Sequence, residues 1–139
     1  MQRSVHNSEV GVVVAGLVLV GVAAAVHLYI FVLESLVWTG EKARATFGTT
    51  PEQARETRSM AFNQGFYNLF LAVEIVVGIV VLATGSTAVG ATLVFVGAGS
   101  MVAAGLVLLT SDRTKTRPAL TQLTPPLLGI ALLAAGLAS

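Results

Sequence analysis

The sequence lacks cysteine altogether, with none among its 139 residues. That absence excludes disulfide bonds, a thiolate nucleophile and cysteine-based metal sites. The sequence also has no EF-hand loop, no HExxH motif and no glycine pattern typical of phosphate or dinucleotide binding. We therefore expect neither a bound metal nor a cofactor.

Charged residues are also scarce, at 11 % of the chain, whereas a soluble domain usually carries about 25 %. The net charge is only +1, and no dense basic stretch with interleaved aromatic residues is present. A nucleic-acid partner is therefore not expected. With a hydrophobic fraction of 55 % and a mean hydropathy of +0.83, the composition is typical of a protein that crosses a membrane several times.

The sequence predicts four helices, each with a long apolar segment, at residues 10–38, 51–83, 88–109 and 118–137. About 20 residues suffice for a helix to cross the hydrocarbon of a bilayer. The first segment exceeds the apolar part of a cleaved signal peptide, which is about 7–15 residues long, so we interpret it as a retained helix. The sequence predicts an all-α membrane protein, with residues 1–139 forming one domain, a four-transmembrane-helix bundle.

Two connections carry most of the charge. In the first, Gly48 is expected to end a short helix, and Thr50, Pro51 and Gln53 form the pattern of a capped helix start. Seven Lys and Arg residues lie in or next to the first and third connections between the predicted helices, whereas the other side of the membrane would have only Arg3. The seven are Lys42, Arg44, Arg55, Arg58, Arg113, Lys115 and Arg117. The positive-inside rule then predicts both charged loops in the cytoplasm and both termini outside, in the plasma membrane.

A dense set of polar residues opens the second apolar segment, and polar groups at membrane depth are expensive without a partner or a water-filled cavity. We expect this set to face the bundle interior, together with two polar residues of the first segment. The candidate ligand or proton site comprises His27, Glu34, Asn63, Gln64, Tyr67, Asn68 and Glu74. Helical spacing places Asn63, Tyr67, Phe70 and Glu74 near one face.

Each of these groups also has a structural interpretation. Amides and hydroxyls can simply hydrogen-bond across helices and hold the bundle together. Glu74, deep in its segment, is expected to be neutral or paired, with His27 as the candidate partner. Arg55 and Arg58 are candidates for contacts to an anion or lipid headgroup, although the positive-inside rule together with contacts to anionic lipid is the favoured explanation for them.

Two sequence runs carry a resemblance to a known family. The runs are HLYIFVLESLVW at 27–38 and AFNQGFYNLFLA at 61–72, with FG at 47–48 between them. They resemble the small bacterial four-helix membrane proteins grouped as domain of unknown function 1304, a group with no settled activity. A looser similarity, in Glu56, Arg58, Asn63 and Tyr67, is to the MAPEG enzymes, which are trimeric four-helix proteins; the spacing from Arg to Asn differs from theirs.

The function expected first is binding or transport of a small amphipathic or cationic molecule through the polar intramembrane site. The alternatives are a MAPEG-like enzyme that acts on a lipid-soluble substrate, and a structural or accessory membrane subunit. The expected partners are membrane lipids, such a ligand, and further copies of the chain in a dimer or trimer. The Gly- and Ala-rich first or third segment would then form the contact between copies.

Overall fold

The computed structural model describes residues 2–139, with side chains from Glu9 onward. Within this part of the chain every regular element is a helix, and four helices are long: α1 (Gln2–Phe31), α4 (Arg58–Ala83), α5 (Thr87–Ser111) and α6 (Thr116–Ala138). Each coincides over most of its length with a segment that is long and apolar enough to cross a membrane. The predicted all-α bundle of four membrane-spanning helices is confirmed.

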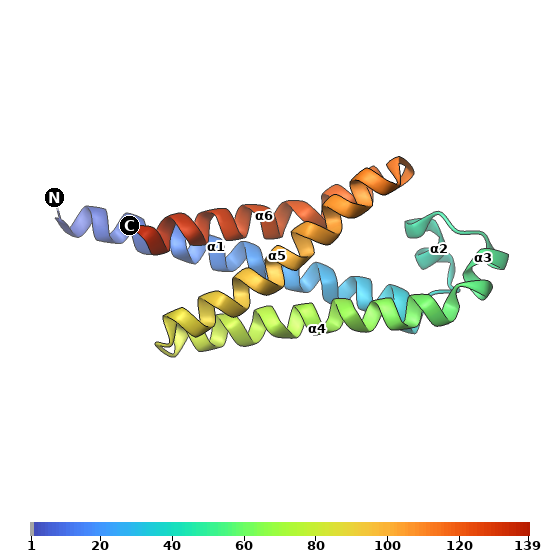
Figure 1. Ribbon diagram of the computed structural model, residues 1–139, viewed down its shortest axis with the longest axis horizontal. Helices are drawn as coiled ribbons and strands as arrows, with labels where there is room; N and C mark the ends of the chain where they lie inside the picture. Colours follow the sequence, from blue (N-terminus) through green and yellow to red (C-terminus); the bar gives the residue numbers. More distant parts are fainter. Residues whose placement is uncertain (1) are drawn as a thin grey trace.

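The four helices form a ring in which α1 packs against α4 and α6, while α5 packs against the same two helices. Figure 1 shows both chain termini and the turn between α4 and α5 at one end of the bundle. The connection from α1 to α4 and the connection from α5 to α6 lie at the opposite end. We call this second end the loop end, and both charged connections are found there.

The boundaries of the first two spans differ from the sequence prediction. The first helix begins at Gln2 instead of residue 10, because a helix that projects beyond a membrane does not need apolar side chains. The second was expected to run unbroken from 51 to 83, but it divides at Thr57 into α3 (Pro51–Glu56) and α4. The Thr57 hydroxyl donates to the Gln53 carbonyl oxygen at 2.7 Å, and side-chain bonds of this kind compete with regular helix.

The first charged connection folds as the sequence predicts. α2 (Glu41–Phe47) ends at Gly48, whose φ of 64° is left-handed, a conformation that glycine adopts without steric cost. Thr50 and Gln53 form a reciprocal capping box at the start of α3, with Pro51 at the first helical position. The connection from α5 to α6 contains a 3₁₀ turn, η2 (Arg113–Lys115). Lys115 donates to the Phe47 carbonyl oxygen, so the two charged connections touch.

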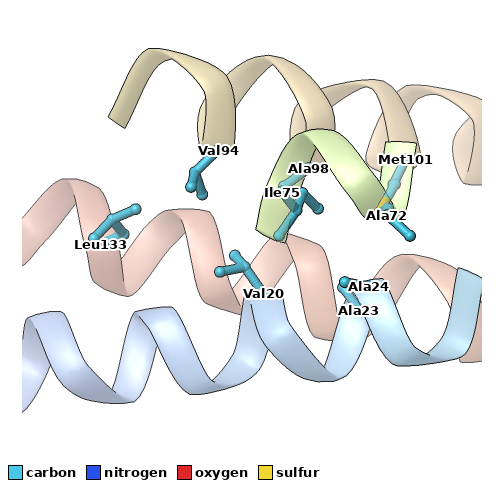
Figure 2. Close-up of a cluster of buried hydrophobic side chains, with 9 residues drawn as sticks. All are labelled: Val20, Ala23, Ala24, Ala72, Ile75, Val94, Ala98, Met101 and Leu133. Atoms are coloured by element: carbon cyan, nitrogen blue, oxygen red, sulfur yellow. The ribbon is translucent and has the colours of Figure 1, made fainter. Parts of the chain in front are cut away.

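The centre of the bundle is built from small and medium side chains. Figure 2 shows the buried cluster, which draws residues from all four helices: Val20, Ala23, Ala24, Ala72, Ile75, Val94, Ala98, Met101 and Leu133. Glycine allows the helices to approach closely; a methyl group at Gly16 would lie 2.7 Å from the Leu133 backbone nitrogen. This close packing of small residues is the usual way in which membrane helices associate.

Candidate functional site

The end of α1 contains a π-helical turn, η1 (Val32–Leu36), in which the Val37 amide donates to the Val32 carbonyl oxygen at 3.1 Å. The bond spans five residues instead of the four of an α-helix, and such turns frequently occur at functional sites. The η1 turn packs against the loop-end half of α4. It therefore places Glu34, from the sequence run 27–38, next to the polar residues of the run 61–72 in α4.

Glu34 lies in this turn and is buried, with 5 % of its surface exposed. The Asn68 side-chain nitrogen donates to Glu34 Oε2 at 2.9 Å, and it also donates to the Gln64 carbonyl oxygen at 3.2 Å. Among residues 9–139 the one ion pair is Arg55 with Glu52, on the surface. Glu34 is therefore a buried carboxyl whose protein partner is a neutral amide.

The residue after Glu34 makes a second polar contact to α4. The Ser35 hydroxyl donates to the Phe62 carbonyl oxygen at 2.8 Å. Gly65 makes this approach possible, because a methyl group there would lie 3.1 Å from the Ser35 backbone nitrogen and would collide with the Ser35 hydroxyl. Our sequence analysis missed both residues. A glycine inside the polar run was the available signal, since small residues mark close helix contacts.

Aromatic residues frame the contact between η1 and α4. Phe31 and Phe66 meet edge to face, with ring centroids 5.2 Å apart. On the other side of Glu34, the Trp38 indole nitrogen donates to the Thr57 hydroxyl at 3.1 Å, and the Trp38 ring lies 5.2 Å from that of Phe47. Residues 31 to 38 thus form a strip that packs against the start of α4.

His27 is buried on α1, with 2 % of its surface exposed. Its Nδ1 atom hydrogen-bonds with the Ala23 carbonyl oxygen at 2.9 Å. His27 precedes Glu34 by seven residues, which places it about 10 Å deeper along the helix axis. The proposed pairing of His27 with Glu74 is not formed, since no hydrogen bond or ion pair joins them in the described residues.

The structure divides the predicted polar cluster into inward-facing, exposed and half-buried residues. Glu34, Asn68 and His27 face inward or toward a neighbouring helix, whereas Asn63, Gln64 and Tyr67 are exposed on α4. Glu74 is half-buried, and its carboxyl carbon would lie 3.6 Å from a methyl group at Gly97 of α5. The expectation that the whole cluster faces the bundle interior is therefore wrong for the exposed members, because α4 buries the face that carries Gly65 and Ala72.

Arg55 and Arg58 are both exposed, and the Arg55 guanidinium pairs with the Glu52 carboxylate at 2.9 Å. Neither arginine is held against Asn63 or Tyr67 by a hydrogen bond in the described part of the chain. Within one chain, the residues on which a MAPEG-like site would depend therefore do not converge on a buried pocket.

An apolar groove of about 370 Å³ lies between α1 and α4, the same two helices that meet at Glu34. Small residues of α1 and branched residues of α4 line most of it: Gly21, Ala24, Ala25, Leu28, Leu69, Ala72, Val73, Val76 and Val77. Leu69 directly follows Asn68 in α4. The contact between these helices thus combines a polar end with an apolar groove.

Fold and site together define a class, a membrane-spanning four-helix bundle with a buried carboxyl where the first span meets the second. A family model described as a protein of unknown function, DUF1304, matches residues 21–134. The chain belongs to this family, in agreement with the resemblance carried by its two sequence runs. No curated protein and no solved structure matches it.

Proposed function

We propose that the protein binds a small amphipathic or cationic molecule at the contact between α1 and α4 and transports it across the plasma membrane. The positively charged part of the ligand would bind to Glu34, and its apolar part would occupy the groove between the two helices. A proton would take the place of the ligand on Glu34 when the site is free. Binding and proton release would then be coupled.

The burial of Glu34 beside a neutral amide is the observation that carries this proposal. A buried ionised carboxylate is strongly unfavourable without a counter-ion, and such a group normally takes up a proton or pairs with a cation. Asn68 supplies one hydrogen bond at 2.9 Å, whereas a carboxylate can accept about four. The site therefore has unused acceptor capacity for a cation.

The groove supports an amphipathic ligand in preference to a bare metal ion. Its lining has no charged side chain, and in the described residues no group of three His, Cys, Asp or Glu side chains lies close enough to hold a metal. An organic cation with an apolar body matches a lone carboxyl next to an apolar surface. Membrane lipids would surround the rest of the bundle.

The orientation of the protein in the membrane is part of the same proposal. The loop end carries seven Lys and Arg residues, so we propose that it faces the cytoplasm and that both termini lie outside. A cysteine introduced at the exposed position Thr46 should react with an impermeant maleimide in inside-out vesicles and not in intact cells. Labelling in intact cells instead would reverse the orientation.

Binding of tetraphenylphosphonium, a permeant organic cation, tests the proposed function. Wild-type protein in lipid nanodiscs should bind this cation in isothermal titration calorimetry and release protons in weakly buffered solution. Glu34→Gln should abolish both signals. The glutamine oxygen can still accept the bond from Asn68, so this variant should fold.

Glu52→Gln provides the matched control, because it makes the same substitution at an exposed carboxyl of the charged connection. This control should bind the cation as the wild type does. If Glu34→Gln also binds it unchanged, Glu34 is not the site. If the wild type binds neither tetraphenylphosphonium nor a smaller quaternary ammonium, the proposed ligand class is wrong and the Glu34–Asn68 contact is structural.

A further inference from the structure

Asn68 is the second polar group at the contact between α1 and α4, and one atom of its side-chain amide has no partner. The Asn68 Nδ2 atom makes two hydrogen bonds, one to Glu34 Oε2 at 2.9 Å and one to the Gln64 carbonyl oxygen at 3.2 Å. An amide nitrogen carries two hydrogens, so both donors are used. The amide oxygen, Oδ1, accepts no hydrogen bond from the described residues.

The partners of Asn68 determine which end of its amide is the nitrogen. A backbone carbonyl oxygen only accepts hydrogen bonds, so the atom that faces the Gln64 carbonyl must be the nitrogen. A flipped amide would instead place Oδ1 against that carbonyl oxygen, and the hydrogen bond would be lost. The free position of Oδ1 therefore follows from hydrogen-bond chemistry, whichever protonation state Glu34 has.

Glu34 presents a second free acceptor at the same contact. Its Oε1 atom has no hydrogen-bond partner in the described residues, although the side chain is buried. Among residues 9–139, the one fully enclosed side-chain nitrogen or oxygen without a partner is Thr49 Oγ1. Glu34 Oε1 and Asn68 Oδ1 are therefore not sealed off, and a water-sized group can reach them. The hydrogen bond between the two side chains holds both free oxygens in one polar patch.

We infer that a bound cation donates hydrogen bonds to both free oxygens, so that the site selects ammonium ions with at least two N–H groups. This inference rests on the proposed function, in which Glu34 binds the charged part of the ligand. A quaternary ammonium or phosphonium ion has no N–H group and can interact with the carboxylate only through its charge. A primary or secondary ammonium ion can also donate to Asn68 Oδ1, and hydrogen bonds from a charged donor are stronger than neutral ones.

The two residues then have different tasks in binding. Glu34 supplies the negative charge, which attracts any cation, whereas Asn68 supplies a neutral acceptor, which distinguishes cations by their hydrogens. Leu69, the next residue of α4, already lines the apolar groove, and that lining has no charged side chain. The ligand class that matches all three features is a protonated primary or secondary amine with an apolar substituent.

A series of four benzyl ammonium ions tests this selection. Benzylamine, its N-methyl and N,N-dimethyl derivatives and benzyltrimethylammonium share one apolar body, and all are cations at pH 7. They carry three, two, one and no N–H groups in that order. Their binding to wild-type protein in lipid nanodiscs is measured by isothermal titration calorimetry, with empty nanodiscs as the blank. Each added methyl group alone would strengthen apolar binding, so a decrease along the series reports lost hydrogen bonds.

We expect the first two ligands to bind within about threefold of each other, because two donors satisfy two acceptors. The second methylation should weaken binding about fivefold or more, and the third by a similar factor. Weakening at the third methylation alone would mean that only Glu34 is contacted, and would overturn the inference. Equal binding of all four would also overturn it but would leave cation binding at Glu34 intact. No binding of any would overturn both proposals.

Asn68→Leu assigns the second acceptor to its residue. Leucine is similar in size but accepts no hydrogen bond, so in this variant the large decrease should move from the second methylation to the third. Gln64→Leu is the matched control, because it makes the same substitution at an exposed side chain one turn away and keeps the Gln64 carbonyl oxygen. It should keep the wild-type pattern. A wild-type pattern in Asn68→Leu would overturn the inference, and the wild-type series decides it even if this variant fails to fold.

Discussion

The two halves of α4 pack against their neighbours by different chemistry. At the loop end, Gly65 admits η1, and side-chain hydrogen bonds from Ser35 and Asn68 cross the contact. In the other half, Gly78 admits α5, and a methyl group there would lie 2.9 Å from the Val94 backbone nitrogen and 3.0 Å from the Gly90 carbonyl oxygen. Glycine allows close helix packing in both halves, but in the described residues only the contact at the loop end also has side-chain hydrogen bonds across it.

The largest effect is expected in the apolar half. Gly78→Ala should destabilise the bundle by about 3 kcal/mol, because the new methyl group meets backbone atoms that cannot rotate away. The free energy of unfolding is measured by titrating the protein in mild detergent with sodium dodecyl sulfate and monitoring its helix content by circular dichroism. Gly99→Ala is the control, since nothing lies within 4 Å of the added methyl group. Equal stability of the two variants would contradict the close α4–α5 contact.

The next effect concerns the hydrogen bond that distinguishes the loop-end half. Glu34→Ala leaves the Asn68 amide without its acceptor and should destabilise the protein by about 2 kcal/mol. Glu34→Gln preserves an acceptor and should lie within about 0.5 kcal/mol of wild type. The same detergent titration compares the two. If Glu34→Gln lost as much stability as Glu34→Ala, the carboxyl would be needed in its ionised form.

A smaller effect, and one that can be reversed, is expected at Gly65. Gly65→Ala should cost about 1–2 kcal/mol, since the methyl group displaces the Ser35 hydroxyl from the Phe62 carbonyl oxygen. Adding Ser35→Ala should restore part of that stability, in a double-mutant cycle with about 1 kcal/mol of coupling. No side-chain truncation on α5 should rescue Gly78→Ala in this way. Additivity of the Gly65 and Ser35 substitutions would show that they do not touch.

The smallest effect lies outside the membrane, in the connection from α5 to α6. The Thr114 hydroxyl and backbone amide donate to Asp112 Oδ1 at 2.6 and 2.9 Å and hold the pKa of Asp112 below its usual value. Because the folded pKa is the lower one, the stabilisation is present above the ordinary Asp value of 3.8 and is lost as the pH falls through the folded pKa.

Thermal melting between pH 6 and pH 3 measures this contribution, and Asp112→Asn should remove only that small part of the pH dependence. Because Asp112 is on the surface, water screens the contribution. A melting profile identical for wild type and Asp112→Asn would show that the turn at Asp112 adds nothing to stability.

Much of the fold could be predicted from the sequence, because long apolar segments and capping residues report on local structure. The four spans, the left-handed Gly48 and the capping box at Thr50 all follow from neighbouring residues. The division of α3 from α4 at Thr57 was not predicted; the Thr57 hydroxyl, which donates to the Gln53 carbonyl oxygen, also accepts a hydrogen bond from Trp38, 19 residues away.

The candidate site could be predicted only in part. Helical spacing groups Asn63 with Tyr67 and Glu74, and Gly65 with Asn68, but both faces of α4 carry apolar and polar residues. The sequence therefore does not indicate which face is buried. The inward face is decided by the close approach of Ser35 to Gly65, a contact between segments 30 residues apart. Glu34 and Asn68 were selected for their chemistry, while their neighbours Ser35 and Gly65 were not.

The π-turn also constrains the length of this segment. The hydrogen bond from the Val37 amide to the Val32 carbonyl oxygen encloses one residue more than the corresponding bond of an α-helix. Each residue of a helix rotates the chain that follows by about 100°. Deleting Leu36 would close the turn and swing Trp38 away from Thr57 while Glu34 stayed at α4. Substitutions at the exposed positions Leu36 and Val37 should thus be tolerated, whereas single-residue insertions and deletions there should not.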